Sequence, residues 1–478
     1  MAANEQSFVM VSGEDDAGSK SKLLMSDPKP AKPARGAQAS LLVLALVGLL
    51  AGCGRGSPGS ETEFQRPAAP DRVPVVLVPG ISREVASILR GGALAPFSAL
   101  ALRADADALA NLGDPRFPAD GTSAVEVPGV LDRALRRTDV RGLQGLIDHL
   151  IREEGYVRGN PDHPRDKDYP ENPSAEREER TRVASLFVVY YDWRRDLSES
   201  ACVLADRIAR IRAATGASRV HLVGYSFGGV VARYYLRYGG RDAMRDRDCP
   251  ASGGTMAAAI NAPGADSVDR LILLGAPHRG SLLAFRALLE DFSLFGFLSL
   301  GLRDAVFTMP LTWQLLPQAE PDGRVPLLVG NNGDERVCLY ALRTWVERGW
   351  IPGGGQDPVR LRFVESMLLR SLALQKSMAG RHPAEEAVPR LVAGGECRPT
   401  PTRALAMGNG VQFLGRGQTD HPLFTKATAP GDGVVTAESA IGLPASPTLT
   451  VLTTCTGHNA YLQDPDLLTR VVQFLLGR

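Results

Sequence analysis

Eight residues decide the fold: Val223-Gly224-Tyr225-Ser226-Phe227-Gly228-Gly229-Val230. They follow an apolar run at 220–223 and precede a helix-like stretch at 231–236, which predicts a strand that turns sharply into a helix. Glycine on either side of Ser226 lets strand and helix approach closely, and so tight a turn pushes the serine hydroxyl outward. The pattern therefore predicts a nucleophilic serine, with the Phe227 N–H at a helix N-terminus, where an oxyanion is stabilised.

Further strands and helices alternate on both sides of this turn. Before it we predict strands at 73–78 and 186–190 and a helix at 198–214, and after it a strand at 268–274. Such alternation is typical of a doubly wound, mostly parallel sheet. A serine at a strand-to-helix turn of such a sheet is the nucleophile elbow of an α/β-hydrolase, so we predict that fold class.

The loop after an early core strand supplies the second oxyanion donor in this fold. Here Pro79-Gly80 stops the strand at 73–78, which makes the backbone N–H of Ile81 or Ser82 the candidate donor. An ordinary turn is the alternative interpretation of this place.

The alternation breaks off after residue 281. We interpret 282–400 as a cap inserted between two parts of the hydrolase core, 73–281 and 401–478. The second part is predicted to contain, in order, strands at 403–407 and 449–452 and a helix at 465–476.

Aromatic residues gather in an uncharged stretch of the predicted cap, among them Phe292, Phe295 and Phe297. Two interpretations are open. These side chains line an acyl pocket or contact a lipid surface, or they form the core of the cap itself.

A serine hydroxyl needs a histidine to take its proton and a carboxylate to hold that imidazole. In an α/β-hydrolase the chain order is Ser, acid, His, which favours His458, between the last predicted strand and the last helix. For the acid we predict Asp432, in a Gly-Asp-Gly turn ahead of His458. Two competitors fit less well: Asp420 has no strand immediately before it, and Asp464 follows the histidine and is expected to cap the last helix.

The composition bears on which binding partners, metals and cofactors we expect. The net charge is +1 and 22% of residues are charged, so we expect no nucleic-acid partner. No Cys/His spacing resembles a zinc site, and we expect neither metal nor cofactor.

The chain carries six cysteines. If Cys53 is modified, at most two bridges form among the others and one thiol is left. Cys338 with Cys397 is one candidate pair, although sequence does not fix the connectivity, and Cys202 fits a small buried residue.

The first part of the chain resembles a bacterial lipoprotein signal peptide. A polar, lysine-containing stretch leads into an apolar run at 40–51 that ends in Leu50-Ala51-Gly52-Cys53. The run is short for a bilayer span, which favours a removed segment. The resemblance implies a signal peptide over 1–53, lipidation of Cys53 and a flexible linker over 54–72. It also implies export to the cell envelope, and the Gly after Cys53 favours the outer membrane.

Several segments together resemble the lecithin:cholesterol acyltransferase and phospholipid:diacylglycerol acyltransferase family. The matching segments, in family order, are residues 75–80, Gly155-Tyr156-Val157, Tyr191-Asp192-Trp193-Arg194, the elbow, Leu274-Gly275-Ala276-Pro277, residues 313–317, and Gly431-Asp432 with His458. The resemblance implies Ser226 as nucleophile, Asp432 as acid and His458 as base. Trp193 is either a lipid-binding residue or a structural one. Tyr225 and His278-Arg279 depart from the family pattern, which leaves the acyl acceptor open.

We predict from these features a membrane-tethered serine esterase of the lipase or phospholipase kind, or an O-acyltransferase, that acts on glycerolipid esters. Water or an alcohol accepts the acyl group, depending on how dry the closed site is. Two alternatives are a non-catalytic lipid-binding surface lipoprotein and an esterase of small soluble esters.

Overall fold

The computed structural model describes residues 72–81, 142–165, 183–250, 256–290, 293–294, 298–299, 302–330, 333–408, 410–414 and 417–478. The predicted signal segment with Cys53, the linker up to residue 71, Ser82, and Phe292, Phe295 and Phe297 lie outside the described residues. None of the described helices is long and apolar enough to cross a membrane.

The core of the fold is a seven-stranded sheet in which every neighbouring pair is parallel. Its spatial order is β15-β10-β5-β4-β1-β3-β2. The strands are β1 (Val75–Val78), β2 (Arg158–Gly159), β3 (Leu186–Val188), β4 (Val220–Tyr225), β5 (Val268–Leu274), β10 (Arg390–Gly395) and β15 (Leu449–Thr454). This doubly wound sheet, with an elbow at the end of β4, confirms the predicted α/β-hydrolase fold.

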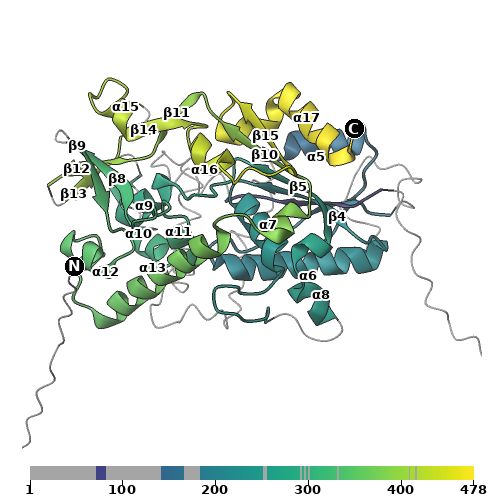
Figure 1. Ribbon diagram of the computed structural model, residues 1–478, viewed down its shortest axis with the longest axis horizontal. Coiled ribbons are helices and arrows are strands. Elements are labelled where there is room, and N and C mark those ends of the chain that lie inside the picture. Colours follow the sequence, from purple (N-terminus) through teal and green to yellow (C-terminus); the bar gives the residue numbers. More distant parts are fainter. Residues whose placement is uncertain are drawn as a thin grey trace, which may run out of the picture. The chain divides into compact units, whose positions relative to one another are not determined.

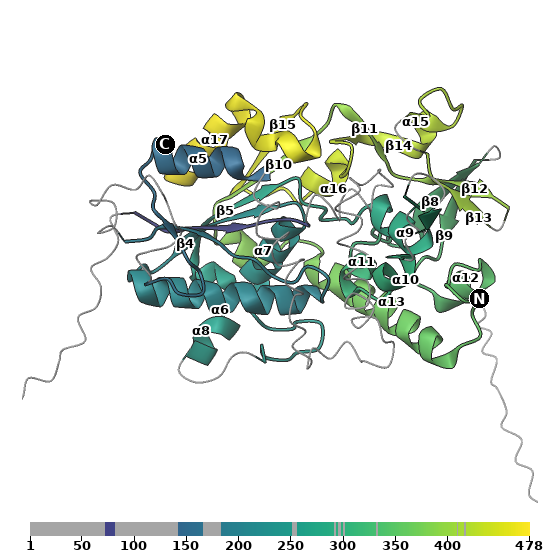
Figure 2. The same cartoon turned by 180° about the vertical axis from the view of Figure 1, so that it is seen from behind.

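Helices cover both faces of the sheet (Figures 1 and 2). On one face lie α6 (Leu197–Thr215), α7 (Phe227–Tyr238) and α8 (Ala257–Asn261), followed by the short helix η4 (Gly264–Asp266). On the other lie α5 (Gln144–Arg152), η5 (His458–Gln463) and α17 (Pro465–Leu476).

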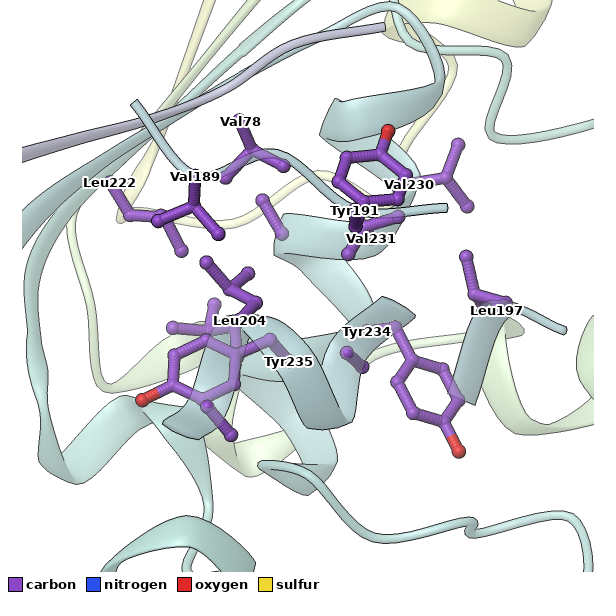
Figure 3. Close-up of a cluster of buried hydrophobic side chains, with 14 of the residues drawn as sticks. Val78, Val189, Tyr191, Leu197, Leu204, Leu222, Val230, Val231, Tyr234 and Tyr235 are labelled. Atoms are coloured by element: carbon purple, nitrogen blue, oxygen red, sulfur yellow. The ribbon is translucent and has the colours of Figure 1, made fainter. Parts of the chain in front are cut away.

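Strand β1 faces two hydrophobic cores, because successive side chains of a strand point to opposite faces. Val76 and Val78 pack with α6 and α7, and Figure 3 shows Val78 among residues of this cluster. Val75 and Leu77 pack with α5 and α17. All four valine and leucine side chains are fully buried, which explains why the strand is apolar at every position.

The remaining elements form a cap with its own aromatic core. It contains a four-stranded sheet of order β13-β12-β8-β9 and two short two-stranded sheets. Phe285, Trp313, Trp345, Trp350 and Phe363 pack together in its core. The cap elements are α9 (Leu282–Leu289), β6 (Ser293–Leu294), β7 (Leu298–Ser299), α10 (Leu302–Phe307), α11 (Pro310–Gln314), β8 (Val325–Gly330), β9 (Gly333–Val337), α12 (Leu342–Glu347), α13 (Pro358–Met378), β11 (Arg398–Pro401), β12 (Ala404–Met407), β13 (Gly410–Gln412), α15 (Phe424–Ala427) and β14 (Thr428–Gly431). Helix α14 (Pro383–Glu386) packs on α7 and η4 of the core, and α16 (Ala437–Ile441) packs on β10.

The boundary between cap and core differs from the prediction in two places. Strand β10 lies inside the predicted cap segment 282–400, yet it pairs with β5 and β15 in the main sheet. Strand β12, predicted as a late core strand at 403–407, instead pairs with β8 in the cap sheet. β10 is hard to recognise in the sequence because it ends in two glycines. A larger residue does not fit at the second of them, because a Cβ at Gly395 would lie 2.6 Å from Asp432 Cβ.

A buried ionic cluster joins the cap to the core. Arg370 of α13 donates from Nε and Nη2 to both carboxylate oxygens of Asp196, at 2.8 and 2.7 Å, and Asp196 also caps α6. Arg370 Nη1 donates to Asp242, and Gln314 Nε2 donates to Asp196, each at 2.8 Å. Burial alone would raise the pKa of Asp196, but its hydrogen bonds and charge interaction with Arg370 lower it. Asp196 is therefore ionised at neutral pH and paired with Arg370.

Among the described residues two disulfides form, Cys202–Cys249 and Cys397–Cys455, and Cys338 is an exposed free thiol. The expected limit of two bridges and one thiol holds, but the candidate pair Cys338–Cys397 is wrong, and Cys202 is bonded as well as buried. Cys397 and Cys455 follow the adjacent strands β10 and β15, whose ends bring their Cα atoms to 4.8 Å. That proximity depends on the sheet order, which spacing along the chain does not reveal.

Candidate active site

The elbow places Ser226 between β4 and α7 in a strained backbone conformation, with φ 55° and ψ −127°. The flanking glycines are required by contact. A Cβ at Gly224 would lie 2.5 Å from Gly229 Cα, and one at Gly228 would lie 2.2 Å from the carbonyl oxygen of Val78. The serine is thus held at the strand end by backbone packing that only glycine permits.

The structure brings the three predicted triad residues together. His458 Nε2 lies 2.9 Å from Ser226 Oγ, and His458 Nδ1 lies 2.7 Å from Asp432 Oδ2. Asp432 is fully buried and His458 is 6% exposed, so the hydrogen bond between them is shielded from water. The competing carboxylates lie elsewhere: Asp420 is exposed, and Asp464 caps α17.

The surroundings of Asp432 keep it charged and oriented. Its Oδ1 accepts backbone N–H groups of Val434 and Val435 at 2.8 and 2.7 Å, and its Oδ2 accepts the Tyr461 hydroxyl at 2.7 Å. Burial alone would raise the pKa of this carboxyl, but the adjacent His458 and these hydrogen bonds lower it. Because the ionised Oδ2 can only accept a hydrogen bond, His458 carries its hydrogen on Nδ1 and turns the Nε2 lone pair toward Ser226.

Two tyrosines that the sequence analysis did not select hold the histidine and the acid. Tyr225 donates its hydroxyl to the carbonyl oxygen of His458, and the two rings lie 5.5 Å apart. Tyr461 accepts the Gly395 N–H at 2.8 Å while it donates to Asp432. The signal for Tyr225 was its place in the elbow, where it departs from the family pattern. Tyr461 gave no signal, because its partners come from other elements.

Phe227, one predicted oxyanion donor, directly follows the serine, and Ile81, the other, belongs to a loop that passes close to it. Phe227 is the first residue of α7, so its N–H has no acceptor one turn back in the helix. Ile81 follows Pro79-Gly80, and this loop passes close to the nucleophile: a Cβ at Gly80 would lie 2.7 Å from Ser226 Cβ. The Tyr191 hydroxyl donates to the Pro79 carbonyl oxygen at 2.7 Å and so anchors the loop.

The Tyr-Asp-Trp-Arg segment is buried. Trp193 is 3% exposed and packs in the main core, and its Nε1 has no hydrogen-bond partner among the described residues. Arg194 is fully buried and donates to both oxygens of Asp192 at 2.7 Å. This placement favours the structural alternative for Trp193. No cluster of possible metal ligands occurs within the described ranges.

Comparison with known proteins bears on the segment around the elbow. Residues 180–297 match the lecithin:cholesterol acyltransferase family. The matched segment includes Tyr191-Asp192-Trp193-Arg194 and the elbow, whereas Asp432 and His458 lie beyond it. At a general level the match supports a lipid ester hydrolase or acyltransferase of the serine hydrolase type, and the expected family resemblance is confirmed over these residues. No curated protein matches the sequence significantly.

Three solved structures share a partial likeness with this chain. The Tle4–Tli4 complex matches at 15% identity and a TM-score of 0.48, covering 85% of this chain and 98% of the other. The mature lipase BlEst2 of Bacillus licheniformis matches at 17% identity and 0.31, covering 67% and 90%. The carboxylesterase CesB of Bacillus subtilis matches at 13% identity and 0.24, covering 68% and 83%. With scores this low, the fold assignment stands on the strand order and the elbow.

Proposed function

We propose that this protein is a serine-dependent lipid ester hydrolase or O-acyltransferase that works through an acyl-enzyme on Ser226. The single observation that carries the proposal is the hydrogen-bonded chain from Ser226 Oγ through His458 to the buried Asp432. The family match around the elbow supports lipid esters as the substrate class.

The proposed reaction has two half-steps. His458 Nε2 takes the Ser226 hydroxyl proton while Oγ bonds to the ester carbonyl carbon, and the N–H groups of Phe227 and Ile81 stabilise the oxyanion. The carbonyl carbon then releases the alcohol, which receives the proton from His458. In the second half-step water or a second alcohol loses its proton to His458 and attacks the acyl-enzyme. His458 then returns a proton to Ser226 Oγ as the bond between Oγ and the acyl carbon breaks, which frees Ser226 and yields an acid or a new ester.

Product analysis on a mixed phospholipid and triacylglycerol emulsion, with and without cholesterol or diacylglycerol, tests this proposal. We expect free fatty acid, or new sterol or glyceride ester, that disappears with Ser226→Ala. Ser366→Ala, at an exposed position of α13, is the matched control and should keep full activity. If no lipid yields a Ser226-dependent product, the proposal is wrong. Cleavage of short soluble esters alone would show that the substrates are small esters and not lipids.

We also propose that the enzyme is exported and held at a membrane of the cell envelope through a lipid on Cys53. The supporting feature is the apolar run that ends in a small-residue box before this cysteine. Metabolic labelling with a fatty acid should mark the wild type and not Cys53→Ala. Equal labelling of both proteins would refute lipidation at this residue.

A further inference from the structure

A cavity of about 520 Å³ lies where cap and core meet. Its walls come from α7, the loop after β5, the segment before β8, the end of α13 and α16. Ser226, Asp432 and His458 do not line it. Arg233 lines it and lies seven residues after Ser226 on α7, about 10 Å further along the helix axis at 1.5 Å per residue. The cavity is therefore a separate place from the candidate active site.

Arg233 offers this cavity an unused pair of donors. Its side chain is 3% exposed, with Nε bonded to Glu385 at 2.7 Å and Nη2 bonded to the Met378 carbonyl oxygen at 3.1 Å. Nη1 has no hydrogen bond to any described residue, and it is not fully buried. Burial lowers the pKa of Arg233 to about 10, so the guanidinium stays charged at neutral pH. A buried cation with free N–H groups suits an anionic ligand.

The charge around Arg233 is unbalanced. Three guanidiniums, those of Arg233, Arg237 and Arg390, bond to the single carboxylate of Glu385, and all four side chains are 3% exposed or less. The C-terminal carbonyls of α13 accept from Arg237 and offset part of the excess, because a helix ends in partial negative charge. Glu386 lies 3.8 Å from Arg390 but pairs more closely with Arg381, at 3.0 Å. Positive charge remains in excess next to the cavity.

A histidine beside the same wall adds polar groups that lack partners. His278 lines the cavity, and neither ring nitrogen has a hydrogen bond in the described part of the chain. Burial and the charges of Arg233 and Arg237 lower the pKa of His278, so the ring is neutral and holds one N–H donor. Both ring nitrogens are buried. If the ring turned toward the cavity, its N–H could donate a hydrogen bond to a bound ligand.

The other lining residues fit an anion that carries an organic group. Gln318 lines the cavity and its side chain makes no hydrogen bond to a described residue, while Leu282, Val325 and Leu443 supply apolar surface. Two carboxylates also line the cavity, but each has its own cation: Glu438 pairs with Arg279, and Glu320 pairs with Arg336. We propose that this cavity binds a phosphate group, with Arg233 Nη1 and the Gln318 amide as donors.

The phosphate has two possible sources, a phospholipid headgroup or a soluble phosphate, and calorimetric titration of the full chain distinguishes them. The probes are sn-glycero-3-phosphocholine, which has no acyl ester, and inorganic phosphate, with acetate for comparison at constant ionic strength. Because no probe is a substrate, this test is independent of the proposed reaction. Tighter binding of the diester assigns a lipid headgroup, and tighter binding of inorganic phosphate assigns a free phosphate.

Gln318→Glu places a negative charge in the cavity wall and should weaken phosphate binding at least tenfold by repulsion. The matched control is Gln473→Glu, the same change at an exposed position of α17, which should bind as the wild type does. Arg233→Met should also abolish binding, with the melting temperature recorded because this residue bonds to Glu385. The proposal is wrong if neither phosphate probe binds more tightly than acetate, or if Gln318→Glu and Gln473→Glu bind equally.

Discussion

Replacing Asp432 by Asn should disable the histidine without unfolding the site. Two backbone N–H groups, from Val434 and Val435, point at Oδ1, so an Asn side chain is forced to keep its carbonyl oxygen there. Its NH₂ group then occupies the position of Oδ2, 2.7 Å from His458 Nδ1. Since a donor now faces Nδ1, the ring keeps its lone pair on that side and carries its hydrogen on Nε2, toward Ser226. The wrong nitrogen is protonated for accepting the serine proton.

The expected size of the effect follows from the loss of the general base. A comparable change of tautomer in a serine triad lowers kcat about 10⁴-fold, which corresponds to about 5.5 kcal/mol in the activation free energy. The assay is kcat and KM on whichever ester the wild type cleaves, together with thermal unfolding. Because Tyr461 can turn its hydroxyl to accept from the new NH₂ group, we expect the variant to stay folded. KM should change far less than kcat.

The control for this prediction is Asp464→Asn. Asp464 caps α17 through its Oδ1, and Asn is an equally good capping residue, so activity and stability should be nearly those of the wild type. Asp432→Asn with more than a tenth of the wild-type kcat would refute the assigned role of Asp432. A loss of activity in Asp464→Asn with an intact Asp432 would point to the other carboxylate as the acid.

The remaining predictions concern the contacts that support the site. Arg370→Met leaves Asp196 buried without its cation and should cost about 3–5 kcal/mol of unfolding free energy, measured by chemical denaturation. In the wild type the pKa of Asp196 is lower in the folded than in the unfolded protein, so this residue adds stability above its unfolded pKa, and that stability is lost as pH falls through the folded pKa. In Arg370→Met, burial without the cation should raise the folded pKa of Asp196 above the unfolded one. The sign is then reversed, and mild acid should stabilise the variant. A wild-type-like pH profile of stability in Arg370→Met would contradict this assignment. Tyr191→Phe frees the Pro79 carbonyl and should lower kcat up to about tenfold with little change in KM, because the oxyanion loop loses one hydrogen bond of about 1 kcal/mol; an altered KM with unchanged kcat would instead place Tyr191 in substrate binding.

Chain order and local pattern were sufficient to select residues that the fold brings together. Ser226 could be chosen because strand, turn and helix follow one another within a few residues, so their pattern is written locally. His458 and Asp432 could be chosen because an α/β-hydrolase presents its base and acid in a set order at the ends of late strands. The supporting tyrosines could not be chosen in this way. Tyr461 contacts Gly395 and Asp432 from a different element, and nothing in its own neighbourhood indicates that contact.

The sequence by itself determined the elbow, the fold class and the three residues proposed for the triad, because these depend on periodicity, glycine spacing and chain order. Only the tertiary structure decided that β10 belongs to the main sheet, that Cys397 bonds to Cys455, and that Arg370 joins cap to core at Asp196. Each of these depends on which segments become neighbours in space. Sequence separation carries no record of that, because the contacts form between residues that are tens to hundreds of positions apart.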